Sequence, residues 1–325
     1  MKVVCDAHIP FFVEAVLEGW QDVEICPMEP EQIDASVVRD VDVLVVRTRT
    51  RVNEALLSGS RVRMVCTATI GFDHIDTAYC DAHRIRWMSC PGCNARAVCD
   101  YIEEAIGDVQ RDKVLCSKEL TIGVVGVGHV GSLVAKMAER KGYKVLLNDP
   151  PKGIGVSFDE SEGIGFFSDG EIADCDIITF HVPLDDTTFH MCDAAFLAKC
   201  KPGTLIINAA RGGVVDEEAL LKSGHPYVLD TWENEPDINP QVLQHAFRAS
   251  MHIAGYSLEG KRNASQMCLD AISDAFGMPR LVIPKTSVES EHLSVARPGW
   301  LSAVTEALKA QPDSFESLRK AYPLR

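Results

Sequence analysis

The chain has 325 residues, of which 46% are hydrophobic and 24% are charged, and its formal net charge is -15. The length suits two domains of ordinary size, and the mean hydropathy of +0.01 is typical of a globular protein with sizeable cores. The acidic balance argues against nucleic acid as a partner. The sequence contains no apolar run long enough for a membrane span, so we expect no membrane association either.

The N-terminal stretch MKVVCDAHIP is too short and too quickly polar for a signal peptide. The twelve cysteines are scattered, and the single C-x-x-C pair, Cys90 and Cys93, has no second pair at the spacing of a zinc site. We therefore expect reduced thiols, no bound metal and a cytoplasmic location.

In the first hundred residues, short apolar runs alternate with helical patterns. We expect helices at 10–18 and 53–57. The expected strands are 3–5, 23–25, 43–46, 64–67 and 86–88.

The stretch VDVLVVRTRTR, residues 41–51, follows a buried strand with Arg47, Arg49 and Arg51 at every second position. If the extended conformation persists, all three side chains point to the same face. This pattern is open to two interpretations: a solvated strand edge, or a local basic patch that binds an anion.

A long helix near 94–116 precedes a second alternating series. Further helices are expected at 261–276, 300–310 and 314–321, with a loop at 279–298. The expected strands are 121–125, 144–148, 176–180, 204–208, 228–229 and 251–253. The alternation predicts an α/β protein with two doubly wound parallel-sheet domains.

The strongest local signal is the stretch TIGVVGVGHVGSLVAKMAERKGYKVLLNDPP, in which Gly126, Gly128 and Gly131 form G-x-G-x-x-G between a strand and a helix. These glycines allow a tight turn, close approach of a pyrophosphate, and close packing of helix on strand. Asp149, at the end of the next strand, would bind the adenosine ribose hydroxyls and repel a 2′-phosphate. The pattern predicts a Rossmann domain that binds NAD rather than NADP.

Three later segments, INAARGGVVDEEAL, VLDTWENEPDI and SMHIAGYSLEG, each follow or end an expected strand. Ligands of open α/β sheets bind at the carboxyl ends of the strands, so Arg211, Asp230, Glu235 and His252 could converge there. A histidine beside a carboxylate suits proton transfer near neutral pH, and an arginine can hold a carboxylate. Taken singly, each residue also has a purely structural interpretation.

Six stretches of the chain resemble, in the same order, the motifs of the D-2-hydroxyacid dehydrogenase family. They are VVGVGHVG, DPP, FHVPL, INAARGGVVDEEAL, LDTWENEP and HIAG. The resemblance implies a flavodoxin-like substrate domain beside the Rossmann domain. It also implies that Arg211 binds substrate, Glu235 is the acidic partner and His252 is the acid/base. The cofactor-binding residues that it implies are Gly126, Gly128, Gly131, Asp149, Thr179, Ala209, Ala210, Arg211, Asp230 and Gly255.

One branch of that family, which acts in vitamin B6 biosynthesis, resembles the chain in DAHIPF, VRTRTRVNEALL, TATIGFDHID, SCPGCNA, LNDPP and HIAGYSLEGK. The implied activity is NAD-dependent oxidation of 4-phospho-D-erythronate to 2-oxo-3-hydroxy-4-phosphobutanoate. Thr48, Thr69 and Tyr256 fall at the branch's substrate-contacting positions, and Arg47 is our candidate for binding the phosphate. Arg319 is a further phosphate candidate, reaching across a dimer.

The resemblance places a substrate domain at 1–93 and 256–285, an NAD-binding domain at 94–255, and a short C-terminal extension of dimerisation type at 286–325. It implies a homodimer, with a 2-oxo acid as the reoxidant of tightly held NADH. Two alternatives stay open: a dehydrogenase of 3-phosphoglycerate, hydroxypyruvate or glyoxylate, or a non-enzymatic NAD sensor similar to the C-terminal binding corepressors.

Overall fold

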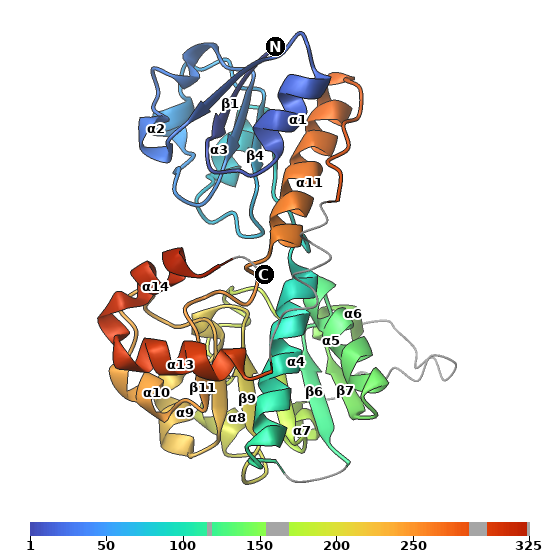
Figure 1. Ribbon diagram of the computed structural model, residues 1–325, viewed down its shortest axis with the longest axis vertical. Helices are drawn as coiled ribbons and strands as arrows, with labels where there is room; N and C mark the ends of the chain where they lie inside the picture. The colour runs from blue at the N-terminus through green and yellow to red at the C-terminus, as the bar shows by residue number, and fades with distance from the viewer. Residues whose placement is uncertain (116–118, 154–168, 286–297, 324–325) are drawn as a thin grey trace. The chain divides into compact units, whose positions relative to one another are not determined.

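The computed structural model describes residues 1–115, 119–153, 169–285 and 298–323. The chain divides into two compact units (Figure 1). Unit 1 comprises Met1–Asn94 and Tyr256–Ser294, and unit 2 comprises Ala95–Gly255 and Val295–Arg325.

Unit 1 contains a five-stranded sheet in the order β2-β1-β3-β4-β5, and every strand pair in it is parallel. This order is that of the flavodoxin-like doubly wound fold. The strands are β1 (Lys2–Asp6), β2 (Glu24–Met28), β3 (Val43–Val46), β4 (Met64–Thr67) and β5 (Arg86–Met88).

Alternate residues of the strands of unit 1 enter two separate cores, as the period of a strand requires. Val3 and Val43 pack in one core with residues of α1 (Phe12–Gly19) and α11 (Leu258–Phe276). Val4 and Leu44 pack in the other core. The remaining helical elements are α2 (Glu54–Leu57), α3 (Thr77–Ala82), η1 (Pro30–Gln32) and η2 (Val38–Asp40).

Unit 2 contains a six-stranded sheet in the order β11-β10-β9-β8-β6-β7, again with every pair parallel. The strands are β6 (Thr121–Val125), β7 (Lys144–Asn148), β8 (Ile177–Phe180), β9 (Leu205–Asn208), β10 (Tyr227–Leu229) and β11 (Arg248–Ala249). The strand order reverses between β6 and β8, which is where doubly wound sheets bind their ligands. The predicted α/β class with two parallel sheets is confirmed.

The helices of unit 2 pack around this sheet (Figure 1). The α-helices are α4 (Ala95–Arg111), α5 (His129–Arg140), α6 (Pro150–Gly153), α7 (Asp169–Ala173), α8 (Ala194–Leu197), α9 (Glu217–Ser223), α10 (Pro240–His245), α13 (Trp300–Ala310) and α14 (Phe315–Ala321). The 3-10 helices are η3 (Gly212–Val214) and η4 (Pro312–Ser314).

One local prediction is wrong. The strand expected at 251–253 is a turn, because His252 has a left-handed φ of 57° and the N–H groups of Ile253 and Ala254 bind the Asp230 carboxylate.

The strand that ends at Val46 does not continue through the arginines, since the Thr50 N–H donates to the Arg47 carbonyl in a turn. The condition for a shared strand face of the three arginines is therefore not met.

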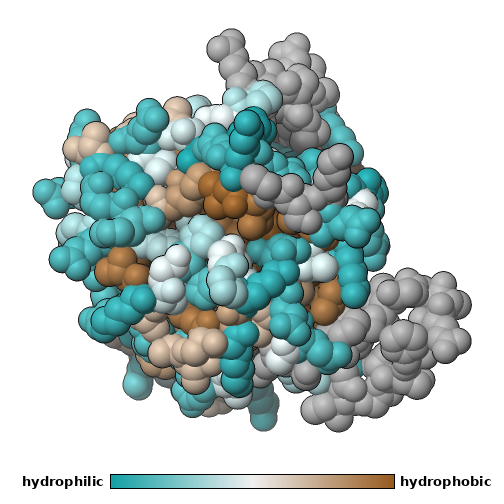
Figure 2. All heavy atoms as spheres, turned by 90° about the horizontal axis from the view of Figure 1, so that it is seen from below, coloured by the Kyte–Doolittle hydropathy of each residue, from teal (hydrophilic) through white to brown (hydrophobic). Residues whose placement is uncertain are grey.

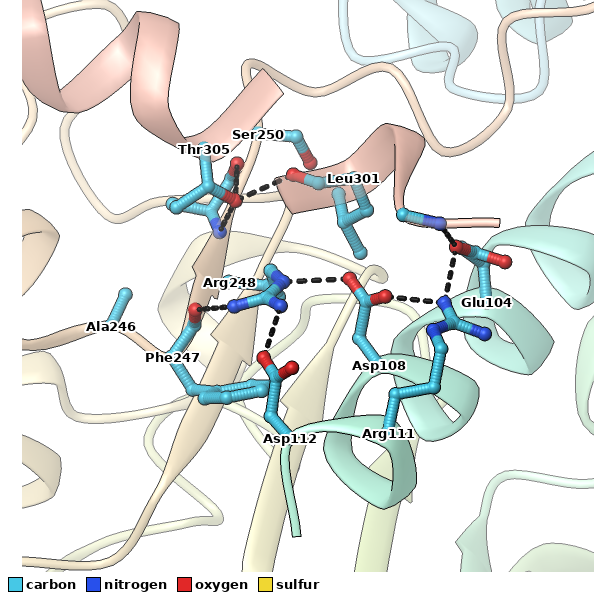
Figure 3. A network of polar contacts seen from close by, with 12 residues as sticks. Glu104, Asp108, Arg111, Asp112, Ala246, Phe247, Arg248, Ser250, Leu301 and Thr305 are labelled. Atoms are coloured by element: carbon cyan, nitrogen blue, oxygen red, sulfur yellow. Dashed lines mark hydrogen bonds and ion pairs between the residues drawn. The ribbon is translucent and has the colours of Figure 1, made fainter. Parts of the chain in front are cut away.

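The C-terminal helices belong to unit 2, where α13 packs on α4 and on the edge strand β11. Figure 3 shows the polar contacts at this place. The Thr305 hydroxyl binds both the N–H and the carbonyl of Ala249 on β11, at 2.9 and 3.0 Å. The Glu104 carboxylate accepts from the Gly299 N–H at 2.6 Å. The edge strand is thereby covered, which protects it from pairing with other chains.

The face of the molecule in Figure 2 is mostly hydrophilic, and its hydrophobic residues form small separate areas. None of the helices that the structure describes has the length and apolar character needed to cross a membrane.

Candidate active site

A histidine–carboxylate pair lies in unit 2. His252 Nδ1 is 2.8 Å from Glu235 Oε2, and both side chains are partly exposed. Because Nδ1 is engaged by the carboxylate, Nε2 is the ring nitrogen left to exchange a proton with a substrate. The structure thus brings together two of the three residues predicted as catalytic.

His252 is held in place by the turn that replaces the predicted strand. The Asp230 carboxylate, only 1% exposed, accepts hydrogen bonds from the Ser250 hydroxyl at 2.6 Å and from the Ile253 and Ala254 N–H groups at 2.7 and 2.9 Å. The His252 N–H donates to the Asp230 carbonyl at 2.8 Å. Asp230 therefore organises the turn that presents His252, and the predicted contact of its side chain with a cofactor stays a prediction.

Glu235 is oriented by the loop after β10. Its Oε1 accepts from the Trp232 N–H at 2.9 Å, while Oε2 faces His252. Burial raises the pKa of Glu235, but the hydrogen bond and charge of His252, the Trp232 N–H and the charge of Arg319 outweigh it and leave the pKa below its ordinary value. Glu235 is thus a carboxylate at neutral pH, able to stabilise a protonated His252.

Arg319 acts on this pair from within unit 2. It lies on α14 and forms an ion pair with Glu316 at 3.4 Å. The charge that it exerts on Glu235 comes from the same chain, and the predicted binding of phosphate by Arg319 across a dimer stays a prediction.

Arg211, the third predicted catalytic residue, lies between β9 and η3. Its Nη1 donates to the Ala210 carbonyl at 2.8 Å. The next residue, Gly212, has no room for a side chain, because a Cβ would come within 1.9 Å of the Trp232 carbonyl oxygen. This close approach brings the turn that bears Arg211 against the backbone of the loop that bears Glu235.

A second histidine–carboxylate pair lies in the same unit, and no local sequence pattern predicts it. His190 Nε2 is 2.6 Å from Glu233 Oε1. The Glu233 N–H in turn donates to Glu217 Oε1 at 2.9 Å. Glu217 is 4% exposed, so its contact with the Glu233 N–H anchors the loop between β10 and α10 two residues before Glu235.

The three glycines of the G-x-G-x-x-G motif have the local geometry that a dinucleotide site requires. Gly126 has φ 86° and approaches the His181 carbonyl closely, and a Cβ on Gly131 would lie 1.9 Å from the Gly126 carbonyl oxygen. At Gly128, which caps α5, a Cβ would meet nothing within 4 Å. The space over Gly128 and the N-terminus of α5 therefore fit the pyrophosphate of a dinucleotide.

The other predicted cofactor residues border the same edge of the sheet. Asp149 Oδ2 accepts from the Val127 N–H at 2.9 Å, which places an acid beside the glycine turn. Thr179 is the residue before the last of β8, and its hydroxyl is 3.0 Å from His181 Nε2. Ala209 and Ala210 follow β9, and Ala210 N–H donates to the Asn208 side chain. Gly255 follows the turn held by Asp230.

In unit 1, Arg47 forms a two-bond ion pair with Asp6. Arg47 Nε and Nη2 donate to Asp6 Oδ2 and Oδ1 at 2.8 and 2.9 Å, and Asp6 is fully buried. Arg49 is 3.9 Å from Glu31 with both side chains largely exposed, and Arg51 is exposed. The structure therefore separates Arg47, which is fixed in place, from the other two arginines.

The other predicted substrate residues differ in their exposure and in the contacts that their side chains make. Thr48, next to Arg47, is exposed. The Thr69 hydroxyl donates to the Gly71 carbonyl at 2.9 Å and lies 2.6 Å from the Thr67 hydroxyl. Lys261 Nζ lies 5.3 Å from the centre of the Tyr256 ring. Asp6, which binds Arg47, and Lys261, which lies over the Tyr256 ring, contact two of the predicted residues. Neither was predicted individually, although they lie in the motifs DAHIPF and HIAGYSLEGK.

Comparison with known proteins agrees with this geometry. Residues 103–254 match the family model described as D-isomer specific 2-hydroxyacid dehydrogenase, NAD binding domain. An erythronate-4-phosphate dehydrogenase of Bacteroides fragilis is 41% identical over an alignment that covers 100% of this chain and 97% of the relative. One from Porphyromonas gingivalis is 37% identical and covers 99% of this chain and 92% of the relative.

Solved structures share the fold. The cofactor (NAD+)-bound 3-phosphoglycerate dehydrogenase of Entamoeba histolytica aligns with a TM-score of 0.70 at 24% identity, over 88% of this chain and 99% of that one. The D-lactate dehydrogenase of Aquifex aeolicus, complexed with NAD and lactic acid, aligns with a TM-score of 0.67 at 23% identity, over 87% and 100%. Identity to the curated relatives along the whole length shows that this chain belongs to the erythronate-4-phosphate dehydrogenases, NAD-dependent enzymes of the D-isomer specific 2-hydroxyacid dehydrogenase family.

Proposed function

We propose that this protein oxidises 4-phospho-D-erythronate at C2 to 2-oxo-3-hydroxy-4-phosphobutanoate, with NAD as the hydride acceptor, in pyridoxal phosphate biosynthesis. The relatives that share the whole chain are named for erythronate 4-phosphate. The single observation that carries the chemistry is the pairing of His252 Nδ1 with Glu235 at 2.8 Å.

In this reaction His252 acts as the base. Its Nε2 takes the proton of the C2 hydroxyl as hydride leaves C2, and the Glu235 carboxylate stabilises the imidazolium that forms. Asp230 keeps the His252 turn in place through its three hydrogen bonds.

Arg211 is proposed to hold the substrate's carboxylate. One of its donors is bound by the Ala210 carbonyl, which fixes the guanidinium near its own backbone, and a planar guanidinium matches a carboxylate with two parallel hydrogen bonds. When bound, NAD supplies the hydride-accepting ring. Gly128, the α5 N-terminus and Asp149 are the residues proposed to hold its pyrophosphate and ribose.

Several further assignments are part of this proposal. Unit 1 is the substrate domain and unit 2 the NAD-binding domain, with helices α13 and α14 contributing to a homodimer. A 2-oxo acid reoxidises the bound NADH. A cytoplasmic location is supported by the cysteines that the structure describes, since all of them are free thiols.

The test is turnover of the purified protein on 4-phospho-D-erythronate, with 2-oxoglutarate present, compared with 3-phosphoglycerate, hydroxypyruvate, glyoxylate and glycerate. We expect a clear preference for the four-carbon phosphate. A preference for another 2-hydroxy or 2-oxo acid would assign a different dehydrogenase activity. NAD binding without turnover of any substrate would favour a sensor.

A further inference from the structure

Ser250 lies at a junction of hydrogen bonds behind the His252–Glu235 pair. It follows β11 directly and is fully buried. Its hydroxyl donates to Asp230 Oδ1 at 2.6 Å, and its carbonyl accepts from the Trp232 indole N–H at 2.8 Å. Asp230 holds the turn that bears His252. The Trp232 backbone N–H binds Glu235 Oε1 at 2.9 Å. One residue thus contacts the supports of both members of the pair.

The phenol of Tyr101 extends this network to α4. Its oxygen is 2.8 Å from the Ser250 hydroxyl oxygen. A serine hydroxyl has one hydrogen, and Ser250 gives that hydrogen to the Asp230 carboxylate. Tyr101 is therefore the donor and Ser250 the acceptor in the contact between them. The three groups form a chain in which each hydroxyl donates to the next group, and the chain ends at the carboxylate.

Tyr101 has a fixed position in unit 2. Its side chain is fully buried in the core of that unit. Its ring meets the Trp300 ring of α13 edge-on, with 5.9 Å between the ring centres. Because protein cores are closely packed, the phenol has little freedom to move, and it fixes the hydroxyl that it contacts.

The buried charge of Asp230 makes this donor important. Asp230 is 1% exposed, so its carboxylate has lost most of its hydration, and hydrogen bonds must offset that loss. In a protein interior, a hydroxyl that accepts one hydrogen bond becomes a stronger donor in the next. The Tyr101 phenol therefore strengthens the bond from Ser250 to Asp230.

We propose that Tyr101 and Ser250 are positioning residues for the base, His252. The Tyr101 phenol acts through the Ser250 hydroxyl, which holds the Asp230 carboxylate and thereby the turn that presents the base. This inference rests on the proposed function for the role of His252. A base must lie within hydrogen-bond reach of the proton that it takes, and a displacement of about 1 Å can lower a rate by about 10²-fold. Loosening the turn should therefore slow the chemical step and leave substrate binding nearly unchanged.

The test compares Tyr101→Phe with the matched control Tyr227→Phe. Each substitution removes one phenol hydroxyl from a buried tyrosine of unit 2 and keeps the ring. The Tyr227 hydroxyl donates to the Val242 carbonyl at 2.7 Å, so its loss removes a bond of the same kind at another place. The two variants should lose similar stability, and a difference in activity between them then reports on the bond to Ser250.

Two kinds of measurement are made on each protein. The first gives kcat and KM for the acid that the wild type oxidises fastest, which is 4-phospho-D-erythronate under the proposed function. The second is hydrogen exchange of the Ile253 and Ala254 amides, which donate to the Asp230 carboxylate. Amide exchange reports on opening of the turn whether or not a substrate is turned over.

We expect Tyr101→Phe to lower kcat by about tenfold, as the loss of one hydrogen bond implies, with KM changed by less than about twofold. Its Ile253 and Ala254 amides should exchange about tenfold faster than those of Tyr227→Phe, whose kcat should match the wild type.

A double variant tests whether the phenol acts through Ser250. Ser250→Ala should lower kcat by about 10²-fold. Adding Tyr101→Phe to it should cause no further loss, because the partner of the phenol is already gone. If Ser250→Ala does not fold, the two tyrosine variants decide the inference by themselves.

The outcomes separate this inference from the proposed function. Equal kcat or equal amide exchange in Tyr101→Phe and Tyr227→Phe would overturn the positioning role, even if the wild type oxidises 4-phospho-D-erythronate. Additive losses in the double variant would overturn it as well. A wild type that prefers another 2-hydroxy acid would overturn the proposed function and leave this test intact, since kcat is then measured on that acid. If the wild type turns over no substrate, amide exchange decides whether Tyr101 holds the turn.

Discussion

At the scale of single residues, the structure distinguishes two histidine–carboxylate pairs of similar geometry, His252–Glu235 at 2.8 Å and His190–Glu233 at 2.6 Å. Proximity alone does not identify the base. The two differ in what holds them: His252 sits on the turn built by Asp230, whereas the His190 ring also stacks on Phe189. This difference, with the family motif HIAG, leads us to assign the chemistry to His252.

The first prediction follows from this assignment. His252→Ala should lower kcat by about 10²–10⁴-fold, the usual contribution of a general base, while NAD affinity stays close to that of the wild type. His190→Ala is the matched control and should lower kcat far less. Steady-state kinetics and NADH fluorescence titration measure both effects. Equal losses in the two variants would contradict the assignment.

A second prediction concerns Glu217, whose side chain is buried beneath the loop that bears Glu235. Burial raises the pKa of Glu217 from 4.5 to about 7, and the charges of Glu233 and Glu235 add to this, although the Glu233 N–H opposes it. Between pH 4.5 and about pH 7, the folded protein therefore binds more protons at Glu217 than the unfolded chain does. The free energy of unfolding therefore falls as pH rises through this window.

Glu217→Gln removes that titration and keeps an oxygen that can accept from the Glu233 N–H. Relative to the wild type, the variant should gain stability between pH 5 and pH 8, by up to about 3 kcal/mol at 1.36 kcal/mol per pH unit. Urea unfolding at the two pH values measures this gain. A constant difference between variant and wild type would show that Glu217 is ionised in the folded protein throughout.

At the scale of elements, the turn from β6 into α5 contains two glycines whose surroundings differ, one closely packed and one facing open space. Gly131 has no space for a side chain because the Gly126 carbonyl lies against it, whereas Gly128 faces open space. Both positions belong to one motif, so the sequence pattern by itself does not tell their roles apart.

The third prediction compares alanine at these two glycines. Gly131→Ala should lower the free energy of unfolding by about 3 kcal/mol, because the helix must move away from the strand. Gly128→Ala should fold with nearly the wild-type Tm and bind NAD about tenfold or more weakly, since its methyl group occupies the space of the pyrophosphate. Thermal unfolding and NAD titration give both numbers. The reverse pattern would mean that the space over Gly128 is not the cofactor site.

At the scale of the whole molecule, the chain leaves unit 2 at Gly255, crosses into unit 1 and returns for its last helices. The predicted domain boundaries near 94 and 256, and the C-terminal extension of dimerisation type, stay predictions. In the structure, α13 covers the edge strand β11 of unit 2 (Figure 3). An Arg248 side chain bound to Asp108 and Asp112 of the α4 region, each at 2.6 Å, supports the same corner.

The fourth prediction tests how α13 is attached. Thr305→Val keeps the shape of the side chain but leaves the buried N–H of Ala249 without its hydroxyl partner, which should cost about 1–3 kcal/mol of stability. Thr305→Ser retains the hydroxyl and serves as the control. Urea unfolding and hydrogen exchange of the Ala249 amide measure the effect. An Ala249 amide equally protected in both variants would show that α13 is held by other contacts.

The sequence by itself determined the α/β class, most strand positions and the dinucleotide motif, because these depend on local periodicity and on glycines at fixed spacing. The convergence of His252 and Glu235 was predictable because their segments follow or end strands of one sheet, and the family motifs give the same pair. The tertiary structure alone decided that residues 251–253 form a turn and that Arg47 is bound by Asp6. Each of these depends on a carboxylate or a charge far away in sequence, and no local pattern records which distant group a side chain will meet.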